Sequence, residues 1–155
     1  YTKIVRAGWF CVRISAHGVT SLKWFWDTLF SRLRLLFQLL SDFSDRVLDV
    51  TLPPQFKCNP TRTAHVLAIV REALSNTVRH AHARRVEIEA RAMGKHLVVT
   101  IRDDGQGFQL HGIERGYGLR NMYDRARLLG GTLTIDTAPG QGTTITLSAP
   151  LEEMR

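Results

Sequence analysis

Apolar residues recur at intervals of three and four between residues 62 and 82, and this spacing predicts an amphipathic helix. Asn59 or Thr61 stands where the cap of such a helix is expected, on either side of Pro60. The apolar arc is broad, so one face of this helix should be buried. It consists of Val66, Leu67, Val70, Ala73, Leu74, Thr77, Val78 and Ala81.

The same spacing predicts two further helices. One covers residues 21–48, begins at Ser21 and is long enough to pack against or dimerise with a partner helix; a break near Ser41 would divide it in two. The other covers residues 119–129 and is ended by the glycine pair at 130–131.

Alternating apolar and polar residues predict strands. Residues 84–90 and 97–101 are joined by a turn around Gly94 and predict a hairpin. Further strands are predicted at 47–52, 132–138 and 143–151, with a candidate strand at 9–14. This order of elements predicts an α/β (α+β) sandwich, a mixed sheet with helices packed on one face, together with the N-terminal helix.

The composition narrows the class of protein. The chain has 155 residues, 44% of them hydrophobic and 23% charged, as in one globular domain. A net charge of +7 favours anionic partners such as nucleotides, nucleic acid or lipid head groups, with a generically basic surface as the alternative. Cys11 and Cys58 have no metal-binding spacing, which is typical of a reduced intracellular protein. No membrane span or signal peptide is predicted, and because Tyr1 replaces an initiator Met we expect a piece of a longer protein.

Three polar residues share one stripe of the helix predicted at 62–82. Glu72, Asn76 and His80 are spaced four apart, so they lie on one side of the helix at the border of its apolar arc. A half-buried carboxylate beside a carboxamide can bind a hard cation through oxygen or orient a water molecule. A solvated face with ion pairs is the alternative.

A glycine-rich segment follows the strand that is apolar up to Ile101. In Asp103 to Phe108 (DDGQGF), the first carboxylate stands at the strand end and the glycines allow close approach of a ligand. Such a carboxylate can accept a hydrogen bond from an exocyclic amine such as that of adenine. A tight turn is the alternative.

Two more glycine motifs come later in the chain. Gly116 to Leu119 (GYGL) opens a predicted helix, where free N–H groups suit phosphate. Gly140 to Thr144 (GQGTT) is either a hairpin turn or a turn that places the Thr143 hydroxyl beside a pocket. The P-loop, the dinucleotide fingerprint and the protein-kinase motifs do not occur.

These four motifs, in this order, resemble the ATP-binding domain of histidine kinases, in the superfamily of gyrase, heat-shock-chaperone and mismatch-repair ATPases that share the Bergerat (GHKL) fold. Residues 71–81 (REALSNTVRHA) resemble the N box, residues 103–108 the G1 box and residues 116–119 the G2 box. Residues 118–131 and 139–143 are similar to the nitrate-sensor and DesK-like subfamily.

The resemblance also implies roles for individual residues. Asn76 would bind a Mg²⁺ that bridges the phosphates, Glu72 would act as the base or orient water, and Asp103 would recognise the adenine amine. The other implied site residues are Arg79 and His80 near the phosphates, Gly105 and Gly107 around adenine, Gly116, Gly118 and Leu119 at the lid over the phosphates, and Thr143 on the adenine side.

The resemblance covers residues 45–151 and implies the catalytic domain of a two-component sensor histidine kinase, with ATP and Mg²⁺ as cofactors. The enzyme would transfer the γ-phosphate to a histidine on an upstream dimerisation domain, for relay to a response regulator. No His in this chain is followed by Asp or Glu, as the family's phosphoacceptor is, so we expect no usual autophosphorylation of this chain. Residues 1–44 are expected to form an N-terminal segment with a linker or dimerisation helix, a candidate for homodimer contacts, and residues 152–155 a tail.

We expect this domain to be cytoplasmic, within a parent protein that is a candidate for membrane anchoring. Two alternatives stay open: an anti-sigma-factor-type serine kinase of the same superfamily, and a non-catalytic basic module that binds nucleotide or nucleic acid. The second has only the net charge in its favour, because no nucleic-acid recognition motif accompanies it.

Overall fold

A computed structural model describes the backbone of residues 2–7, 10–16 and 47–52, and the backbone and side chains of residues 59–110 and 116–151. The helix predicted over residues 21–48 lies outside these ranges, except that its last two positions begin a strand.

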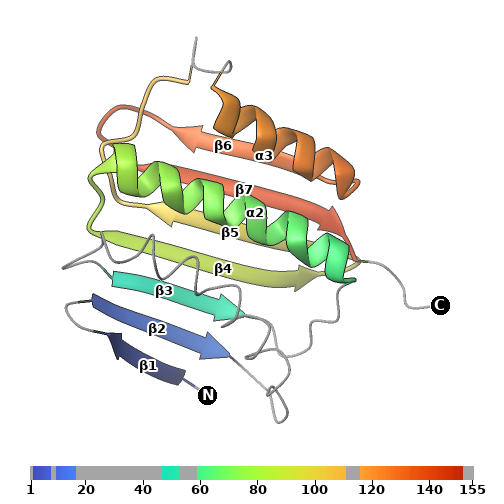
Figure 1. Cartoon of the computed structure of the whole chain (residues 1–155), viewed down its shortest axis with the longest axis horizontal. Helices are drawn as coiled ribbons and strands as arrows, with labels where there is room; N and C mark the ends of the chain where they lie inside the picture. The colour runs from blue at the N-terminus through green and yellow to red at the C-terminus, as the bar shows by residue number, and fades with distance from the viewer. Residues whose placement is uncertain (1, 8–9, 17–46, 53–58, 111–115, 152–155) are drawn as a thin grey trace.

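The described strands form one seven-stranded mixed sheet in the order β1-β2-β3-β4-β5-β7-β6 (Figure 1). β3 pairs in parallel with β2 and β4, and every other neighbouring pair is antiparallel. The strands are β1 (Thr2–Ala7), β2 (Phe10–Ala16), β3 (Val47–Leu52), β4 (Arg85–Met93), β5 (His96–Asp103), β6 (Thr132–Thr137) and β7 (Thr143–Pro150). The predicted mixed sheet is therefore confirmed, and β1 and β2 extend it into the segment before residue 45.

Two helices lie on the same face of this sheet, α2 (Pro60–Asn76) and α3 (Tyr117–Leu128) (Figure 1). At the start of α2, the Asn59 side chain accepts the Thr61 N–H at 2.9 Å, so Asn59 is the cap. Both helices begin two residues earlier than the apolar spacing predicts. The first two residues of each helix, Pro60-Thr61 and Tyr117-Gly118, stand outside the apolar spacing, so the spacing begins later than the helix.

The last turn of the long helix is a π-helix, η1 (Thr77–Ala81), which ends at His82 with φ 51°. The sequence predicted a regular helix to residue 82. A π-turn adds one residue to the turn and is often found at functional sites. Here it lies against the loop that follows β5, where Gln106 donates its backbone N–H to the Ala81 carbonyl at 2.8 Å.

The core lies between the two helices and strands β4 to β7. Every second residue of the strands points toward the helices, which produces the strict alternation of burial along β5 and β7. The largest fully buried side chains are Ile69, Leu74, Val86, Met122, Leu129 and Leu147. None of the described helices is both long and apolar enough for a membrane span.

Candidate nucleotide-binding site

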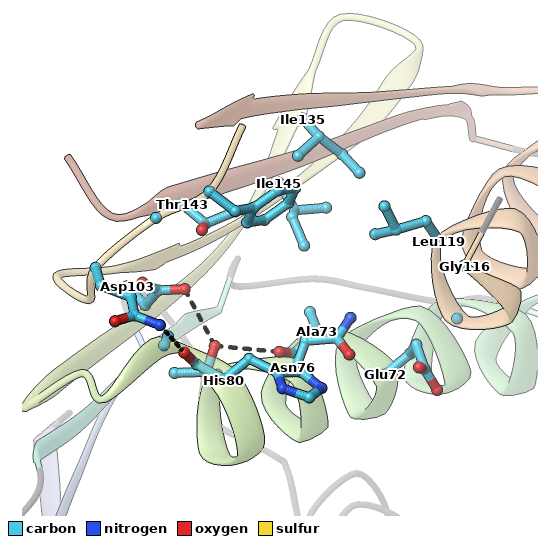
Figure 2. Close-up of a pocket in the computed structure, with 16 residues that line it drawn as sticks. Glu72, Ala73, Asn76, His80, Asp103, Gly116, Leu119, Ile135, Thr143 and Ile145 are labelled. Atoms are coloured by element: carbon cyan, nitrogen blue, oxygen red, sulfur yellow. Dashed lines mark hydrogen bonds between the residues drawn. The ribbon is translucent and has the colours of Figure 1, made fainter. Parts of the chain in front are cut away.

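A cavity of about 440 Å³ lies between α2, η1, the start of α3 and the sheet, at the end of β5 (Figure 2). This volume is within the usual range for small-ligand sites, roughly 300 to 1,000 Å³. Its walls combine apolar side chains with a few polar ones. The lining residues are Glu72, Ala73, Asn76, Thr77, His80, Ala81, Asp103, Gln106, Gly107, Phe108, Gly116, Gly118, Leu119, Ile135, Thr143 and Ile145.

The predicted polar stripe of the long helix faces this cavity. Glu72, Asn76 and His80 all line it (Figure 2); Asn76 is the last residue of α2 and His80 lies within the π-turn. Among the described residues, none hydrogen-bonds the Asn76 carboxamide or the Glu72 carboxylate. The side-chain oxygens of these two half-buried residues are therefore available to bind a ligand or a cation.

Asp103 is the last residue of β5 and is only 7% exposed. Its Oδ1 accepts the Gly105 N–H at 2.9 Å, and its Oδ2 lies 3.2 Å from the Thr77 hydroxyl. The β5–β7 register places Asp103 directly opposite Thr143, so both side chains lie on the cavity face of the sheet. A buried carboxylate thus faces the cavity from the strand end.

The neighbouring Asp104 has a different task. Its Oδ1 accepts the backbone N–H groups of Arg84 and Arg85 at 2.8 and 2.9 Å, and it is not among the residues that line the cavity. It therefore fixes the chain where η1 leads into β4. Of the two adjacent carboxylates, one faces the cavity and the other stabilises the fold.

A chain of hydroxyl and backbone groups holds Thr143. The Thr137 hydroxyl accepts the Phe108 N–H at 3.1 Å and donates to the Gly142 carbonyl at 3.0 Å. Because its proton is used there, its contact of 3.3 Å with the Thr143 hydroxyl has Thr143 as the donor. The Thr143 oxygen then keeps its lone pairs as acceptors.

Three glycines let backbone segments touch beneath the cavity. A Cβ on Gly105 would overlap Ala81, a Cβ on Gly107 would overlap the Ala138 carbonyl, and a Cβ on Gly142 would overlap the Asp103 carbonyl. Gly107 and Gly142 also have positive φ angles of 58° and 71°. The loop after β5 is thus clamped between η1 and the β6–β7 turn.

The start of α3 closes the other end of the cavity. Gly116 and Gly118 line it, and Gly118 lies so close to Glu72 that a Cβ there would meet the carboxylate. Within residues 59–110 and 116–151 no side chain caps α3, and the first turn of this helix has no acidic residue. The free N–H groups and the positive end of the helix dipole therefore favour an anion at this end.

Polarity is thus divided along the cavity. Asp103 and Thr143 offer hydrogen-bond acceptors at one end, while Glu72, Asn76 and the start of α3 lie toward the other (Figure 2). Between these groups lie the apolar side chains of Leu119, Ile135 and Ile145. This arrangement suits an elongated ligand with a flat, partly apolar head and an anionic tail.

Two of the predicted site residues lie outside the lining. Arg79 is exposed on η1 and does not line the cavity, and Gly105 lies behind it against Ala81. The described lining contains neither Lys nor Arg. Among the described residues, the positive end of the α3 dipole is therefore the feature that offsets the charge of an anionic ligand here, together with any cation bound with that ligand.

Seven lining residues are not among the predicted site residues: Ala73, Thr77, Ala81, Gln106, Phe108, Ile135 and Ile145. Thr77 belongs to the predicted apolar arc, and a hydroxyl on an apolar face is the sequence signal that could identify it. The Gln106 side chain donates to the His80 carbonyl at 2.7 Å. This hydrogen bond depends on the π-turn that contains His80, and the apolar spacing does not predict a π-turn.

The donor set fits a hard cation that arrives with phosphates. Asn76 and Glu72 offer oxygen, which Mg²⁺ prefers, and Mg²⁺ is usually held by one or two protein groups plus substrate phosphates and water. The described residues contain no cluster of three or more His, Cys, Asp or Glu that would bind a metal without such help.

The sandwich and its divided cavity are those of a nucleotide-binding domain. Residues 61–153 match the sequence model of the family described as "Histidine kinase-, DNA gyrase B-, and HSP90-like ATPase", and the chain belongs to this family. The predicted family and its Bergerat-type fold are thereby confirmed.

Curated relatives of this chain include two sensor proteins named VraS. The protein from Staphylococcus saprophyticus is 38% identical over 100 residues, which cover 64% of this chain and 29% of the relative. The protein from Staphylococcus aureus strain COL is 39% identical over 90 residues, which cover 57% of this chain and 26% of the relative. The matched part is thus less than a third of each relative's length.

Solved structures share the fold. The histidine kinase domain of the Erythrobacter litoralis EL346 blue-light activated histidine kinase aligns with a TM-score of 0.64 at 24% identity, covering 76% of this chain and 58% of that one. The Acinetobacter baumannii histidine kinase AdeS aligns with a TM-score of 0.65 at 19% identity, and the alignment covers 83% of this chain and 66% of AdeS. At such low identities these likenesses establish the architecture alone.

Proposed function

We propose that this chain is the catalytic domain of a two-component sensor histidine kinase and binds Mg²⁺–ATP in the cavity beside α2. One observation carries the proposal: α2 and the end of β5 bring Glu72, Asn76 and Asp103 around a single cavity whose far end is the start of α3. Family membership and the sensor proteins among its relatives support it.

The division of the cavity suggests how ATP lies in it. Adenine takes the end where Asp103 and Thr143 accept hydrogen bonds, with its ring against Ile135 and Ile145. The triphosphate extends toward Asn76 and the start of α3. The N–H groups at that helix start then offset phosphate charge.

Asn76 is the residue that would hold Mg²⁺ with the phosphates, and Glu72 lies beside it on the same helix stripe. The ion would neutralise charge that develops on the transferred γ-phosphoryl group, which is the main need in phosphoryl transfer. Glu72 lies against Gly118, so its carboxylate is at the phosphate end of the cavity, where it would act as a base or orient water. His80, which lines the cavity, would lie near the phosphates, and Arg79 would approach them only from outside the lining, on the same π-turn.

In the whole protein, the phosphate would pass to a histidine on an upstream dimerisation domain and then to a response regulator. The proposed division is residues 1–44 as the N-terminal segment, 45–151 as the catalytic domain and 152–155 as a tail, with β1 and β2 of the first segment joining the same sheet. On the motifs of its sequence, we place the chain in the nitrate-sensor and DesK-like subfamily. We further propose that the domain is cytoplasmic.

A serine kinase of the same superfamily is the second candidate, because it would use the same nucleotide site. Phosphorylation of an added histidine-bearing domain, compared with a serine-bearing antagonist protein, separates the two. No observation of this structure favours nucleic acid as a partner.

Calorimetric titration with a non-hydrolysable ATP analogue, with and without Mg²⁺, tests the proposal directly. We expect saturable binding that Mg²⁺ strengthens. Absence of binding at millimolar nucleotide would overturn it.

A further inference from the structure

We propose that the buried hydroxyl of Thr77 positions the Asp103 carboxylate and thereby sets how strongly the site prefers adenine to a base with a carbonyl in place of the amine. This inference rests on the proposed function, because it requires the base to face Asp103. Thr77 would be a positioning residue, since it acts through another side chain.

The hydroxyl of Thr77 has two acceptors within reach. It lies 3.1 Å from the Ala73 carbonyl and 3.2 Å from Asp103 Oδ2, and the residue is only 3% exposed. A hydroxyl has one proton, so the two acceptors compete for it. In most helices the carbonyl four residues back would be the partner.

Two features favour the carboxylate here. The Ala73 carbonyl already accepts the backbone N–H of Thr77, whereas no other described group donates to Asp103 Oδ2. Hydrogen bonds to an ionised acceptor are also stronger than neutral ones, and burial strengthens them further. The proton of the Thr77 hydroxyl therefore goes to Asp103.

Two donors from different elements then hold the carboxylate. Gly105 binds Oδ1 from the loop after β5, and Thr77 binds Oδ2 from η1. Threonine is stiff about its first side-chain torsion, so this donor is itself fixed. A carboxylate held at both oxygens is already oriented before the ligand arrives, so binding does not have to immobilise it.

The orientation matters most for an amine. A carboxylate accepts hydrogen bonds only, so the adenine amine pairs with it, whereas the carbonyl of hypoxanthine places two acceptors opposite each other. If the Asp103 carboxylate can rotate, the adenine amine loses an acceptor of fixed orientation. The repulsion between the carboxylate and the hypoxanthine carbonyl is then smaller. Loss of the Thr77 hydroxyl should thus reduce discrimination between the bases rather than binding in general.

The test compares ATP with inosine triphosphate on the whole chain, by calorimetry in the presence of Mg²⁺. Thr77→Val, which keeps the shape and removes the hydroxyl, should weaken ATP about fivefold and inosine triphosphate less than about twofold, as for one indirect hydrogen bond. Thr77→Ser should keep the wild-type ratio of the two affinities. Thr77→Ala is a second hydroxyl-free variant, in case valine is too crowded beside the carboxylate.

Thr63→Val is the matched control. Thr63 lies on the same helix, and its hydroxyl also contacts the carbonyl four residues back, that of Asn59 at 3.2 Å, but it does not line the cavity. This variant should leave the affinity ratio unchanged. A double substitution with Asp103→Ala should abolish the effect of Thr77→Val on the ratio, because Thr77 acts through Asp103.

The inference is overturned if the hydroxyl-free variants leave the ratio unchanged, or weaken both nucleotides equally while Thr77→Ser does not. If the wild-type chain binds neither nucleotide, the proposed function fails as well. Wild-type ATP binding with an unaltered ratio in the variants overturns this inference alone.

Discussion

Asn76 is the residue whose removal should separate metal binding from nucleotide binding. Asn76→Ala removes a cavity-facing oxygen donor that has no described protein partner, so Mg²⁺ loses a ligand. The Mg²⁺-dependent gain in ATP affinity should fall about tenfold or more. Titrations with and without Mg²⁺ measure this.

Arg71→Ala on the exposed side of the same helix is the control and should behave as wild type. If the Mg²⁺ gain of Asn76→Ala equals that of the control, the metal lies elsewhere.

Asp103 and Asp104 form a natural pair for testing base recognition. Asp103→Asn places an NH₂ donor where the adenine amine needs an acceptor, so ATP affinity should fall about tenfold while tripolyphosphate affinity changes little. Asp104→Asn weakens the anchor for the N–H groups of Arg84 and Arg85, so it should lower the melting temperature without altering base preference. Displacement of a fluorescent nucleotide gives the affinities. Equal losses of ATP and tripolyphosphate in Asp103→Asn would contradict the assignment.

At the scale of elements, two glycines that both border the site should respond in opposite ways. Gly118 lies within α3, where alanine is the better helix former by about 1 kcal/mol, and its Cβ would meet only the flexible end of Glu72. Gly118→Ala should therefore keep or raise the stability yet weaken nucleotide binding, because Glu72 is displaced at the phosphate end.

Gly142→Ala should instead destabilise the fold. Its φ is 71°, and its Cβ would meet the backbone carbonyl of Asp103, which cannot move without the strand. Thermal unfolding of both variants beside nucleotide titration measures the contrast. A stable Gly142→Ala, or an unstable Gly118→Ala, would contradict this account.

The elements differ in how well the sequence predicts them. The hairpin of β4 and β5 and the strands β6 and β7 are predicted to within a few residues, because alternation at a half-buried sheet is a direct consequence of burial. The π-turn at Thr77–Ala81 is not predicted, since it depends on tertiary contact with the loop after β5. For the same reason the sequence predicts Thr77 as a residue of the apolar face, although its hydroxyl donates to the Asp103 carboxylate, 26 residues further along the chain.

The site motifs are predictable where one segment defines them. Glu72, Asn76 and His80 lie on one helix stripe, so spacing alone places them together. The pairing of Asp103 with Thr143 requires the β5–β7 register, and the exposed position of Arg79 follows from how the π-turn is rotated. The family resemblance puts Asp103 and Thr143 together on the adenine side, but it also puts Arg79 near the phosphates, whereas Arg79 is exposed and outside the lining.

At the scale of the whole molecule, Arg62 joins three elements far from the cavity. From the first turn of α2 its guanidinium donates to the Leu129 carbonyl after α3 at 3.0 Å and to the Pro150 carbonyl of β7 at 2.7 Å. Arg62→Met keeps most of the apolar stem and removes these donors. The free energy of unfolding should fall by about 1 to 3 kcal/mol, with nucleotide affinity unchanged in the folded chain.

Denaturant unfolding measures the loss, and Arg71→Met, an exposed arginine on the same helix, is the control. If both variants unfold at the same denaturant concentration, Arg62 does not link these elements energetically.

The position of β7 has a consequence for the chain as it leaves the ribosome. β7 is the last described strand in the sequence, yet it lies between β5 and β6 and supplies Thr143 and Ile145 to the cavity. A nascent chain that has reached only β6 therefore lacks both a complete sheet and a complete pocket, and ATP cannot stabilise it. Until β7 inserts, the open edges of β5 and β6 remain available to chaperones and to misassembly.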